Sequence, residues 1–334
     1  MSQLDNEREE MMAKKDEMRI MNSNKMEIMK SLSKINCGEP PVYKSSRFDM
    51  VTRQKLGEGR FSTVYLGSVS YAPRQLMAIK SIDLNKINRH DPAVLNKCLH
   101  REIEILQRTH HPNLVELHGV HLKGRKLFLV HEYLSNGSLL ARVPIDEEEA
   151  KRVFRQLIEG VHYLHKLQLI HRDIKCENVM LDACDNIKLI DFTFARDNGQ
   201  LSPLRTRCGT TPYMAPELFI GYMFRTPYDG RMTDWWSVGV CLYVTSCGQV
   251  PFDTAHPTWV YKIDKRTRFE SKCYDNDAFR ALCRMVFCAD PTKRAGYEMI
   301  RESAWLRDTK WRIERSPKTR PNDKTTQDEI DSKK

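Results

Sequence analysis

The hydrophobic pattern of the chain changes near Gly137, and this change most constrains the fold. Before it, short runs rich in β-branched and aromatic residues are typical of strands, with one longer run of helical spacing at 92–110. After it, apolar residues recur at helical spacing. We predict an α+β chain with a small β-rich lobe and a larger α-helical lobe. The expected strands are residues 50–56, 62–70, 76–82, 114–120 and 126–133.

The two ends of the chain differ from this centre. Residues 1–46 are charged and Met-rich, with apolar residues spaced along one helical face. We predict a solvated, fraying helical extension, with a short coiled coil or a helix that docks on the body or a partner as the alternatives. Residues 309–334 are charged and nearly free of apolar side chains, which predicts a disordered tail. The central domain is then 47–308.

Composition narrows the class of protein. Lys and Arg number 54 against 44 Asp and Glu, a net charge of +10, but the basic residues are spread along the chain. We therefore expect no nucleic-acid binding. No apolar run approaches the roughly 18 residues of a membrane span, and the amino terminus lacks a signal-peptide core. The ten cysteines show no metal-site spacing and are expected to be reduced. We expect a cytoplasmic protein, with the nucleus as the alternative.

The segment LGEGRFSTV contains two glycines, Gly57 and Gly59, with Ser62 in the place of a third. A dinucleotide-binding fold requires a helix directly after such glycines. Here β-prone residues follow, so the loop is expected to join two strands. A flexible hairpin of this kind can lay its backbone N–H groups over the phosphates of a nucleotide. An ordinary hairpin turn is the alternative.

Two further segments carry charged residues at informative spacing. Lys80 lies in an expected strand, and Glu102 follows on an expected helix. In such a pair the glutamate can hold the lysine ammonium group against the α- and β-phosphate oxygens of a nucleotide. The alternative is that Lys80 is a solvated residue at the edge of a sheet. In HRDIKCEN, Asp173 is the expected acceptor of a hydroxyl proton, and Lys175 neutralises the transferred phosphoryl group. Asn178, with the later Asp191, supplies oxygen ligands for Mg²⁺.

Over residues 49–308 the sequence resembles the eukaryotic protein kinase family. The resemblance rests on eight motifs in the family's order: GEGRFSTV, MAIK, REIEIL, HRDIKCEN, DFT, CGTTPYMAPE, DWWSVGV and DPTKR. It implies a two-lobed kinase fold that uses ATP and Mg²⁺ to phosphorylate protein substrates. Within the family, the chain is most similar to the testis-specific serine/threonine kinases of the calcium/calmodulin-dependent kinase group.

The resemblance also implies how ATP is bound. It divides the domain into an N-lobe (47–131), a hinge (132–137) and a C-lobe (138–308). Glu132 and Leu134 would contact adenine through their backbone, His131 would be the gatekeeper as a satisfied core histidine, and Ala78 and Met180 would enclose the ring with Val64. The nucleotide-binding loop would comprise Leu56, Gly57, Glu58, Gly59, Arg60, Phe61, Ser62, Thr63 and Val64.

Structural roles follow in the same way. The resemblance implies an apolar column anchored by Asp234, and a buried salt bridge between Glu217 and Arg294 that serves stability. The column would comprise Leu106, Leu117, His171 and Phe192.

The activation loop is expected to match the serine/threonine branch of the family, because Lys175 is accompanied by Thr210. Thr206 stands four residues earlier, where relatives carry an activating phosphate that Arg172 would bind. An unmodified loop residue is the alternative for Thr206. Glu177 would favour a basic residue near the target hydroxyl, although Val244 replaces a second acid that such kinases often use.

Three positions depart from the family's pattern. Thr193 replaces the glycine after Asp191-Phe192, and a β-branched residue is expected to stiffen the segment there. Ser138 stands where many kinases have a ribose-binding acid, and 219–234 is longer than usual and a candidate partner surface. The alternative of a scaffold without catalysis is favoured by Thr193, Ser62 and Ser138. An active kinase is favoured by the presence of all five expected catalytic residues, Lys80, Glu102, Asp173, Asn178 and Asp191.

Overall fold

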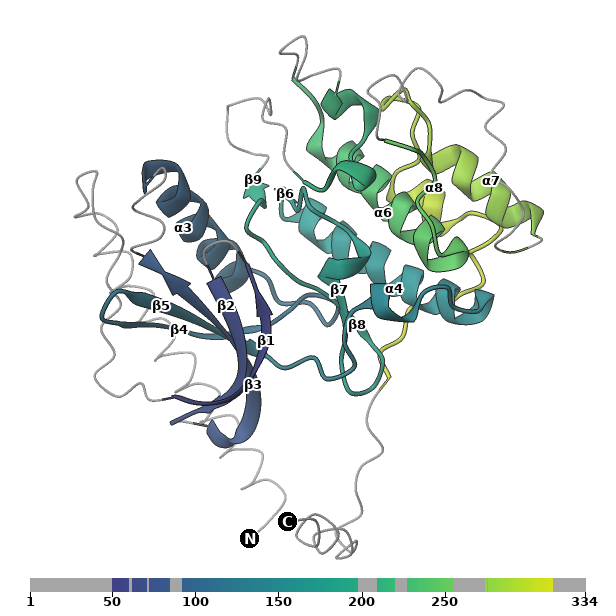
Figure 1. Ribbon diagram of the computed structural model, residues 1–334. Helices are drawn as coiled ribbons and strands as arrows, with labels where there is room; N and C mark the ends of the chain where they lie inside the picture. The colour runs from purple at the N-terminus through teal and green to yellow at the C-terminus, as the bar shows by residue number, and fades with distance from the viewer. Residues whose placement is uncertain are drawn as a thin grey trace, which may run out of the picture. The chain divides into compact units, whose positions relative to one another are not determined.

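The computed structural model describes residues 50–59, 62–70, 72–84, 92–197, 209–219, 227–254, 274 and 276–314. Two compact units can be distinguished (Figure 1). The smaller contains Met1–His100 and Leu117–Glu132, and the larger contains Arg101–Glu116 and Tyr133–Lys334. The predicted extension at 1–46 and residues 220–226 of the candidate partner surface lie outside the described residues.

The smaller unit is built on a five-stranded antiparallel sheet of order β1-β2-β3-β5-β4. In β3, buried Met77 and Ile79 alternate with half-buried Ala78 and Lys80, as expected for a strand with one covered face, whereas residues 127–130 of β5 are all buried. The buried core contains Val69, Met77, Ile79, Phe128 and Val130. The strands are β1 (Met50–Glu58), β2 (Ser62–Val69), β3 (Ala72–Asp83), β4 (Leu117–Lys123) and β5 (Lys126–Glu132).

The fourth strand lies three residues later than the 114–120 that we predicted. Leu114 forms an isolated parallel bridge with Leu189 in the larger unit instead. The Leu189 N–H donates to the Asn113 carbonyl at 2.9 Å, and the Val115 N–H donates to the Leu189 carbonyl at 3.0 Å. These backbone groups are therefore not available to the sheet, and β4 begins only at Leu117.

Helix α3 (Pro92–Arg108) begins at a proline, which has no N–H to leave unpaired at a helix start. Its buried residues include Leu99, Ile103 and Leu106, at the spacing of one helical face. The same face carries Glu102, whose exposed fraction is only 3%. Contacts group the helix after His100 with the larger unit, whereas we had assigned all of it to the small lobe.

The larger unit is mainly helical. Asp146 caps α4 (Glu147–Lys166) by accepting from the Glu149 N–H, and α6 (Gly230–Cys247) is buried along most of its length. The other elements are α7 (Asp277–Val286), α8 (Tyr297–Arg301), β6 (Leu169–Ile170), β7 (Val179–Leu181), β8 (Ile187–Leu189), β9 (Arg196–Asp197), and the 3₁₀ turns η1 (Leu139–Arg142), η2 (Cys176–Asn178) and η3 (Thr211–Tyr213). None of the helices in the described ranges is long and apolar enough to span a bilayer.

One cysteine differs from the expected reduced state. Cys247, the last residue of α6, is disulfide-bonded. The other cysteines in the described ranges are free. The expectation of reduced thiols is therefore wrong at this position.

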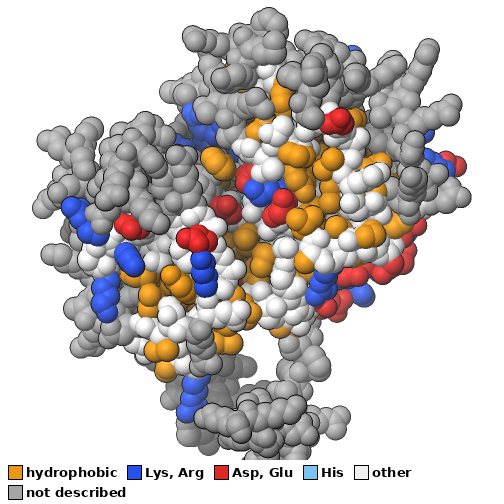
Figure 2. Space-filling model, viewed as in Figure 1, with side chains coloured by type: hydrophobic (Ala, Val, Ile, Leu, Met, Phe, Trp, Pro, Cys, Tyr) orange, Lys and Arg blue, Asp and Glu red, His pale blue; other side chains and the backbone are white. Residues whose placement is uncertain are grey.

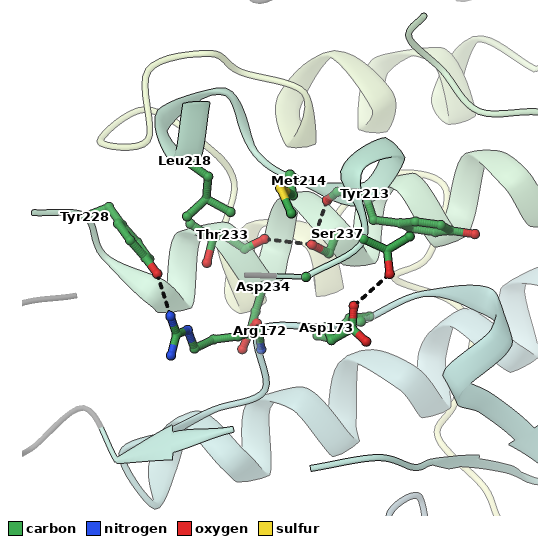
Figure 3. Close-up of a pocket in the computed structure, with 12 residues that line it drawn as sticks. Arg172, Asp173, Tyr213, Met214, Leu218, Tyr228, Thr233, Asp234 and Ser237 are labelled. Atoms are coloured by element: carbon green, nitrogen blue, oxygen red, sulfur yellow. Dashed lines mark hydrogen bonds between the residues drawn. The ribbon is translucent and has the colours of Figure 1, made fainter. Parts of the chain in front are cut away.

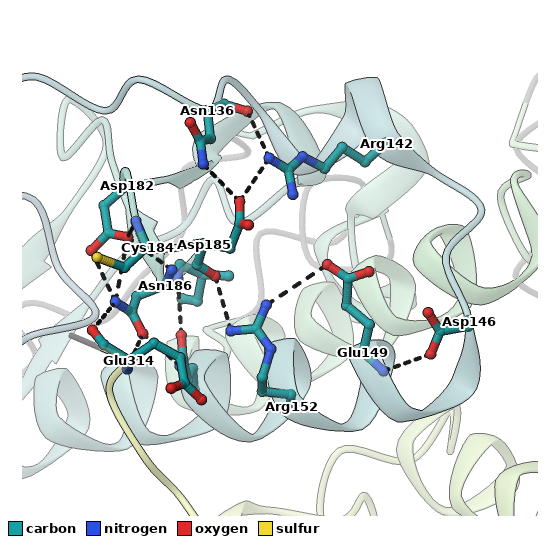
Figure 4. A network of polar contacts seen from close by, with 12 residues as sticks. Asn136, Arg142, Asp146, Glu149, Arg152, Asp182, Cys184, Asp185, Asn186 and Glu314 are labelled. Carbon is teal, nitrogen blue, oxygen red and sulfur yellow. Dashed lines mark hydrogen bonds and ion pairs between the residues drawn. The ribbon is translucent and has the colours of Figure 1, made fainter. Parts of the chain in front are cut away.

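The segment 309–314 is docked on the larger unit, although we predicted disorder from 309. Gln156 Nε2 donates to the Arg312 carbonyl at 2.8 Å, and Trp311 Nε1 donates to Asn113 Oδ1 at 2.9 Å. The Asn186 side chain exchanges two hydrogen bonds with the Glu314 backbone (Figure 4). The three amide side chains that receive this segment are buried, which composition could not reveal.

We expect a chain that ends after Asp308 to be less stable than one that ends after Glu314, by about 2 kcal/mol. In the shorter chain the Gln156 and Asn186 amides lose their hydrogen bonds to this segment. Water molecules replace only part of these hydrogen bonds. Urea denaturation of the two truncated chains measures the difference. Equal midpoints would mean that the segment contributes nothing to stability.

Candidate active site

In the smaller unit, three predicted nucleotide contacts lie on one face of the sheet. Val64 on β2 stands opposite Lys80 on β3, and Ala78 is two residues before Lys80. Met77 and Ile79 point to the opposite, buried face, while Ala78 and Lys80 are half-buried. His131 on β5 pairs with Ala78 on β3. Its side chain is half-buried, so it is not the core histidine that we predicted.

The glycine-containing segment joins β1 to β2, as predicted. Gly57 pairs with Val64, Glu58 pairs with Thr63, and the Gly59 N–H donates to the Ser62 carbonyl at 2.8 Å. No helix follows the glycines, which excludes the geometry of a dinucleotide-binding fold. Arg60 and Phe61 lie outside the described residues.

Glu132, the last residue of β5, belongs to the smaller unit, and the rest of the predicted hinge belongs to the larger one. The Asn136 N–H donates to the Leu181 carbonyl at 3.1 Å, and the Leu181 N–H donates to the Gly137 carbonyl at 2.9 Å. Ser138 and Met180 form the next bridge. The hinge is thereby anchored beside Met180, and Leu134 is buried near its start.

Asp234 on α6 fixes the segment HRDIKCEN. Its two carboxylate oxygens accept the backbone N–H groups of His171 and Arg172, each at 2.9 Å. The His171 ring accepts the Asp173 N–H at Nδ1 (3.3 Å), so its hydrogen is on Nε2 and is donated to the Ile190 carbonyl at 3.0 Å. Phe192 packs edge-on against this ring at 5.0 Å. The anchoring role predicted for Asp234 is confirmed in the larger unit.

Asp173 lies at the centre of a polar cluster in the pocket of Figure 3. Its Oδ1 accepts the Thr210 hydroxyl at 2.9 Å, and its Oδ2 lies 3.0 Å from Lys175 Nζ. Lys175 also donates to Thr210 Oγ1 at 2.8 Å. A carboxylate beside an ammonium and a hydroxyl can accept a proton while the ammonium faces incoming negative charge.

Gly209 allows this cluster to close. Its φ is +102°, and a Cβ there would lie 2.8 Å from the Arg172 carbonyl oxygen. Any other residue would combine a strained backbone with this overlap. The glycine thus allows the Thr210 segment to approach the segment HRDIKCEN (171–178, the predicted catalytic loop) closely.

Asn178 and Asp191 are brought together by the backbone. The Ile190 N–H donates to the Asn178 carbonyl at 2.9 Å, which places Asp191 one residue away. Asn178 donates through Nδ2 to the Asp173 carbonyl at 2.9 Å, so its Oδ1 is the atom suited to a metal. Two hard oxygen donors fit Mg²⁺, which uses few protein ligands together with phosphates and water.

Three arginines gather near the catalytic loop, two of which sequence reasoning missed. Arg196 on β9 pairs with Ile170, directly before His171. Burial, together with the nearby guanidinium groups of Arg172 and Arg101, lowers the pKa of Arg196. Arg172 Nη2 donates to the Tyr228 hydroxyl at 3.1 Å. Like charges held close together are typical of an anion-binding site. Thr206 lies outside the described residues.

The predicted salt bridge between Glu217 and Arg294 is confirmed. The two guanidinium nitrogens lie 2.7 and 2.8 Å from the two carboxylate oxygens. Arg294 also donates to the carbonyls of Cys288 (3.0 Å) and Met232 (2.7 Å), and its side chain is fully buried. The pair is largely buried, in agreement with a structural role.

The protein kinase domain family matches residues 50–306 of the chain. This span covers the sheet of the smaller unit and the helices and catalytic loop of the larger one. The chain therefore belongs to the protein kinase family, and the predicted two-lobed kinase fold is confirmed.

Individual relatives agree with this assignment. The serine/threonine-protein kinase SIK2 of Gallus gallus is 35% identical over 255 residues, which cover 75% of this chain and 31% of SIK2. The serine/threonine-protein kinase SIK1 of Rattus norvegicus is 34% identical over 255 residues, covering 75% and 32%. CBL-interacting protein kinase 8 of Oryza sativa subsp. japonica is 34% identical over 259 residues, covering 75% and 56%. The chain thus spans about a third of the length of the SIK relatives.

Proposed function

We propose that the chain is a protein kinase that transfers the γ-phosphoryl group of ATP to Ser and Thr hydroxyls of proteins. The observation that carries this proposal is the cluster of Asp173, Lys175 and Thr210. Asp173 accepts the proton of the attacking hydroxyl, and Lys175 stabilises the charge of the transferred group. The names of the serine/threonine-protein kinase relatives support the same acceptor class.

The remaining residues position the nucleotide in this proposal. Lys80, paired with Glu102, anchors the α- and β-phosphates, and the loop from Leu56 to Val64 covers them with its N–H groups. Asn178 and Asp191 hold Mg²⁺, which neutralises phosphate charge when it is bound. The adenine ring contacts Ala78 and Met180.

We further propose that substrates carry a basic residue near the target hydroxyl. Glu177 supports this because it is exposed beside the catalytic loop. Val244 is buried in α6 and offers no second acidic contact. On the face seen in Figure 2, basic side chains are dispersed and mixed with acidic ones, which favours protein substrates over nucleic acid or membranes. Location in the cytoplasm or nucleus, similarity to testis-specific kinases and docking through residues 1–46 stay predictions.

The test is phosphoryl transfer by the purified chain from γ-labelled ATP with Mg²⁺ to a basic acceptor protein. We expect phosphoserine and phosphothreonine in the acceptor, and no labelling when Mg²⁺ is chelated. If a chain phosphorylated at Thr206 transfers no label, the catalytic proposal is wrong and the scaffold alternative is favoured.

Thr206 is proposed as the activating phosphosite because Arg172, Arg196 and Arg101 form a cationic cluster. A phosphate there adds nearly two negative charges and can form charge-assisted hydrogen bonds with more than one guanidinium group. We expect Thr206→Ala to lower kcat/KM of the phosphorylated enzyme by about tenfold or more. Arg196→Ala should have a similar effect, and the double variant should lose no more than either single variant. If the losses of the two single variants add up in the double variant, Thr206 and Arg196 act independently. That result would contradict the assignment of Thr206 as the phosphosite.

A further inference from the structure

Thr193 makes contacts that a glycine at this position cannot make. Its hydroxyl oxygen lies 2.6 Å from Asp191 Oδ1 and 3.0 Å from Glu102 Oε2. Its backbone N–H also donates to Asp191 Oδ1, at 3.3 Å. The residue therefore lies between the proposed metal ligand and the buried glutamate of helix α3.

The backbone accommodates this side chain without strain. The left-handed residue of the segment is Asp191, with a φ of +64°, whereas the φ of Thr193 is not positive. A β-branched residue has few χ1 rotamers, so the hydroxyl has little freedom to leave this position. The segment therefore holds the Thr193 hydroxyl in a defined position, at no cost in backbone strain.

We propose that the Thr193 hydroxyl is a positioning group that ties the metal-binding carboxylate of Asp191 to Glu102 on helix α3. This inference rests on the proposed function, in which Asp191 holds Mg²⁺ and Glu102 orients Lys80. Both carboxylates accept hydrogen bonds, and bonds to a charged acceptor are the stronger kind. One hydroxyl that reaches both makes the placement of α3 and the orientation of the metal ligand depend on each other.

The single hydrogen of the hydroxyl gives this dependence a direction. Threonine can donate to one carboxylate at a time, and the shorter contact is with Asp191. Donation to Asp191 Oδ1 restricts the rotamers of that carboxylate, so the metal ligand is oriented before a cation binds. The position of the hydroxyl in turn depends on Glu102, so whatever displaces α3 also displaces the hydroxyl from Asp191. Mg²⁺ binding and the docking of α3 therefore support each other through Thr193.

Two variants of the full chain separate the hydroxyl from the shape of the side chain. Thr193→Val keeps the β-branched shape and removes the hydroxyl, and Thr193→Ser keeps the hydroxyl and removes the methyl group. The Kd of ADP is measured by calorimetry with Mg²⁺ and again with the metal chelated. We expect Thr193→Val to weaken binding with Mg²⁺ by about tenfold while binding without Mg²⁺ is unchanged. Thr193→Ser should recover most of the loss.

A third variant tests the partner. On a Glu102→Gln background, Thr193→Val should have a much smaller effect on the Kd with Mg²⁺, because the stronger acceptor on α3 is already lost. Hydrogen exchange gives a second readout. Amides of α3 from Arg101 to Arg108 should exchange faster in Thr193→Val than in Thr193→Ser when ADP and Mg²⁺ are present.

The outcomes are distinguishable. Similar affinities for the Val and Ser variants, or an equal loss with and without Mg²⁺, would overturn the positioning role while the kinase assignment stands. An undiminished effect on the Glu102→Gln background would overturn the tie to α3. A wild-type chain that does not bind ADP with Mg²⁺ would overturn both this inference and the proposed function.

Discussion

Asp173→Asn is expected to lower the rate of phosphoryl transfer by about 10²–10⁴-fold, the range typical of removing a general base. The carboxylate has two oxygens, and only one of them faces Lys175 and Asn178 Nδ2. The amide of the variant can keep its carbonyl oxygen there and turn its NH₂ towards the Thr210 oxygen. The cluster is thus preserved while the proton acceptor is lost.

The rate is measured with saturating ATP and Mg²⁺ on a basic acceptor protein. Asp308→Asn makes the same chemical change on a side chain that is 94% exposed, and we expect it to leave the rate unchanged. Unfolding midpoints of both variants should match the parent chain. A rate within about threefold of the parent would show that Asp173 is not the base, since removal of a general base costs far more than this.

Glu217→Gln is expected to destabilise the chain by about 3 kcal/mol. Arg294 is fully buried, and both of its terminal nitrogens are paired with the carboxylate of Glu217. The amide keeps one acceptor but leaves the guanidinium charge without a counter-charge in the interior. Breaking a buried pair on one side costs more than the pair itself contributes, because the remaining ion stays desolvated.

Urea denaturation measures this loss. The matched control is Glu298→Gln, since Glu298 pairs with Arg301 at 3.7 Å and its side chain is 71% exposed. A solvated pair of this kind contributes little, so we expect the control to change the midpoint only slightly. Equal shifts in the two variants would show that the charge of Arg294 is solvated or neutralised by other groups.

The strands and helices were predictable where one periodicity extends over a whole element. The expected strands at 50–56 and 62–70 agree with β1 and β2 to within two residues at each end. The fourth strand was misplaced because Leu114 and Val115 are as strand-prone as the residues that follow them. The Asn113 carbonyl and the Val115 N–H, on either side of Leu114, bond to Leu189, 74 or more positions away, and no local pattern encodes such a choice.

The proposed chemistry was predictable from the sequence alone, since the order and spacing of Asp173, Lys175, Asn178 and Asp191 leave few other interpretations. The tertiary structure alone decided what surrounds these residues. Arg196 joins Arg172, segment 309–314 docks on buried amides, and Thr193 reaches Glu102 across 91 positions of the chain. Motif spacing is local and reflects reaction chemistry, whereas these contacts depend on which distant backbone and side-chain groups folding leaves to be paired.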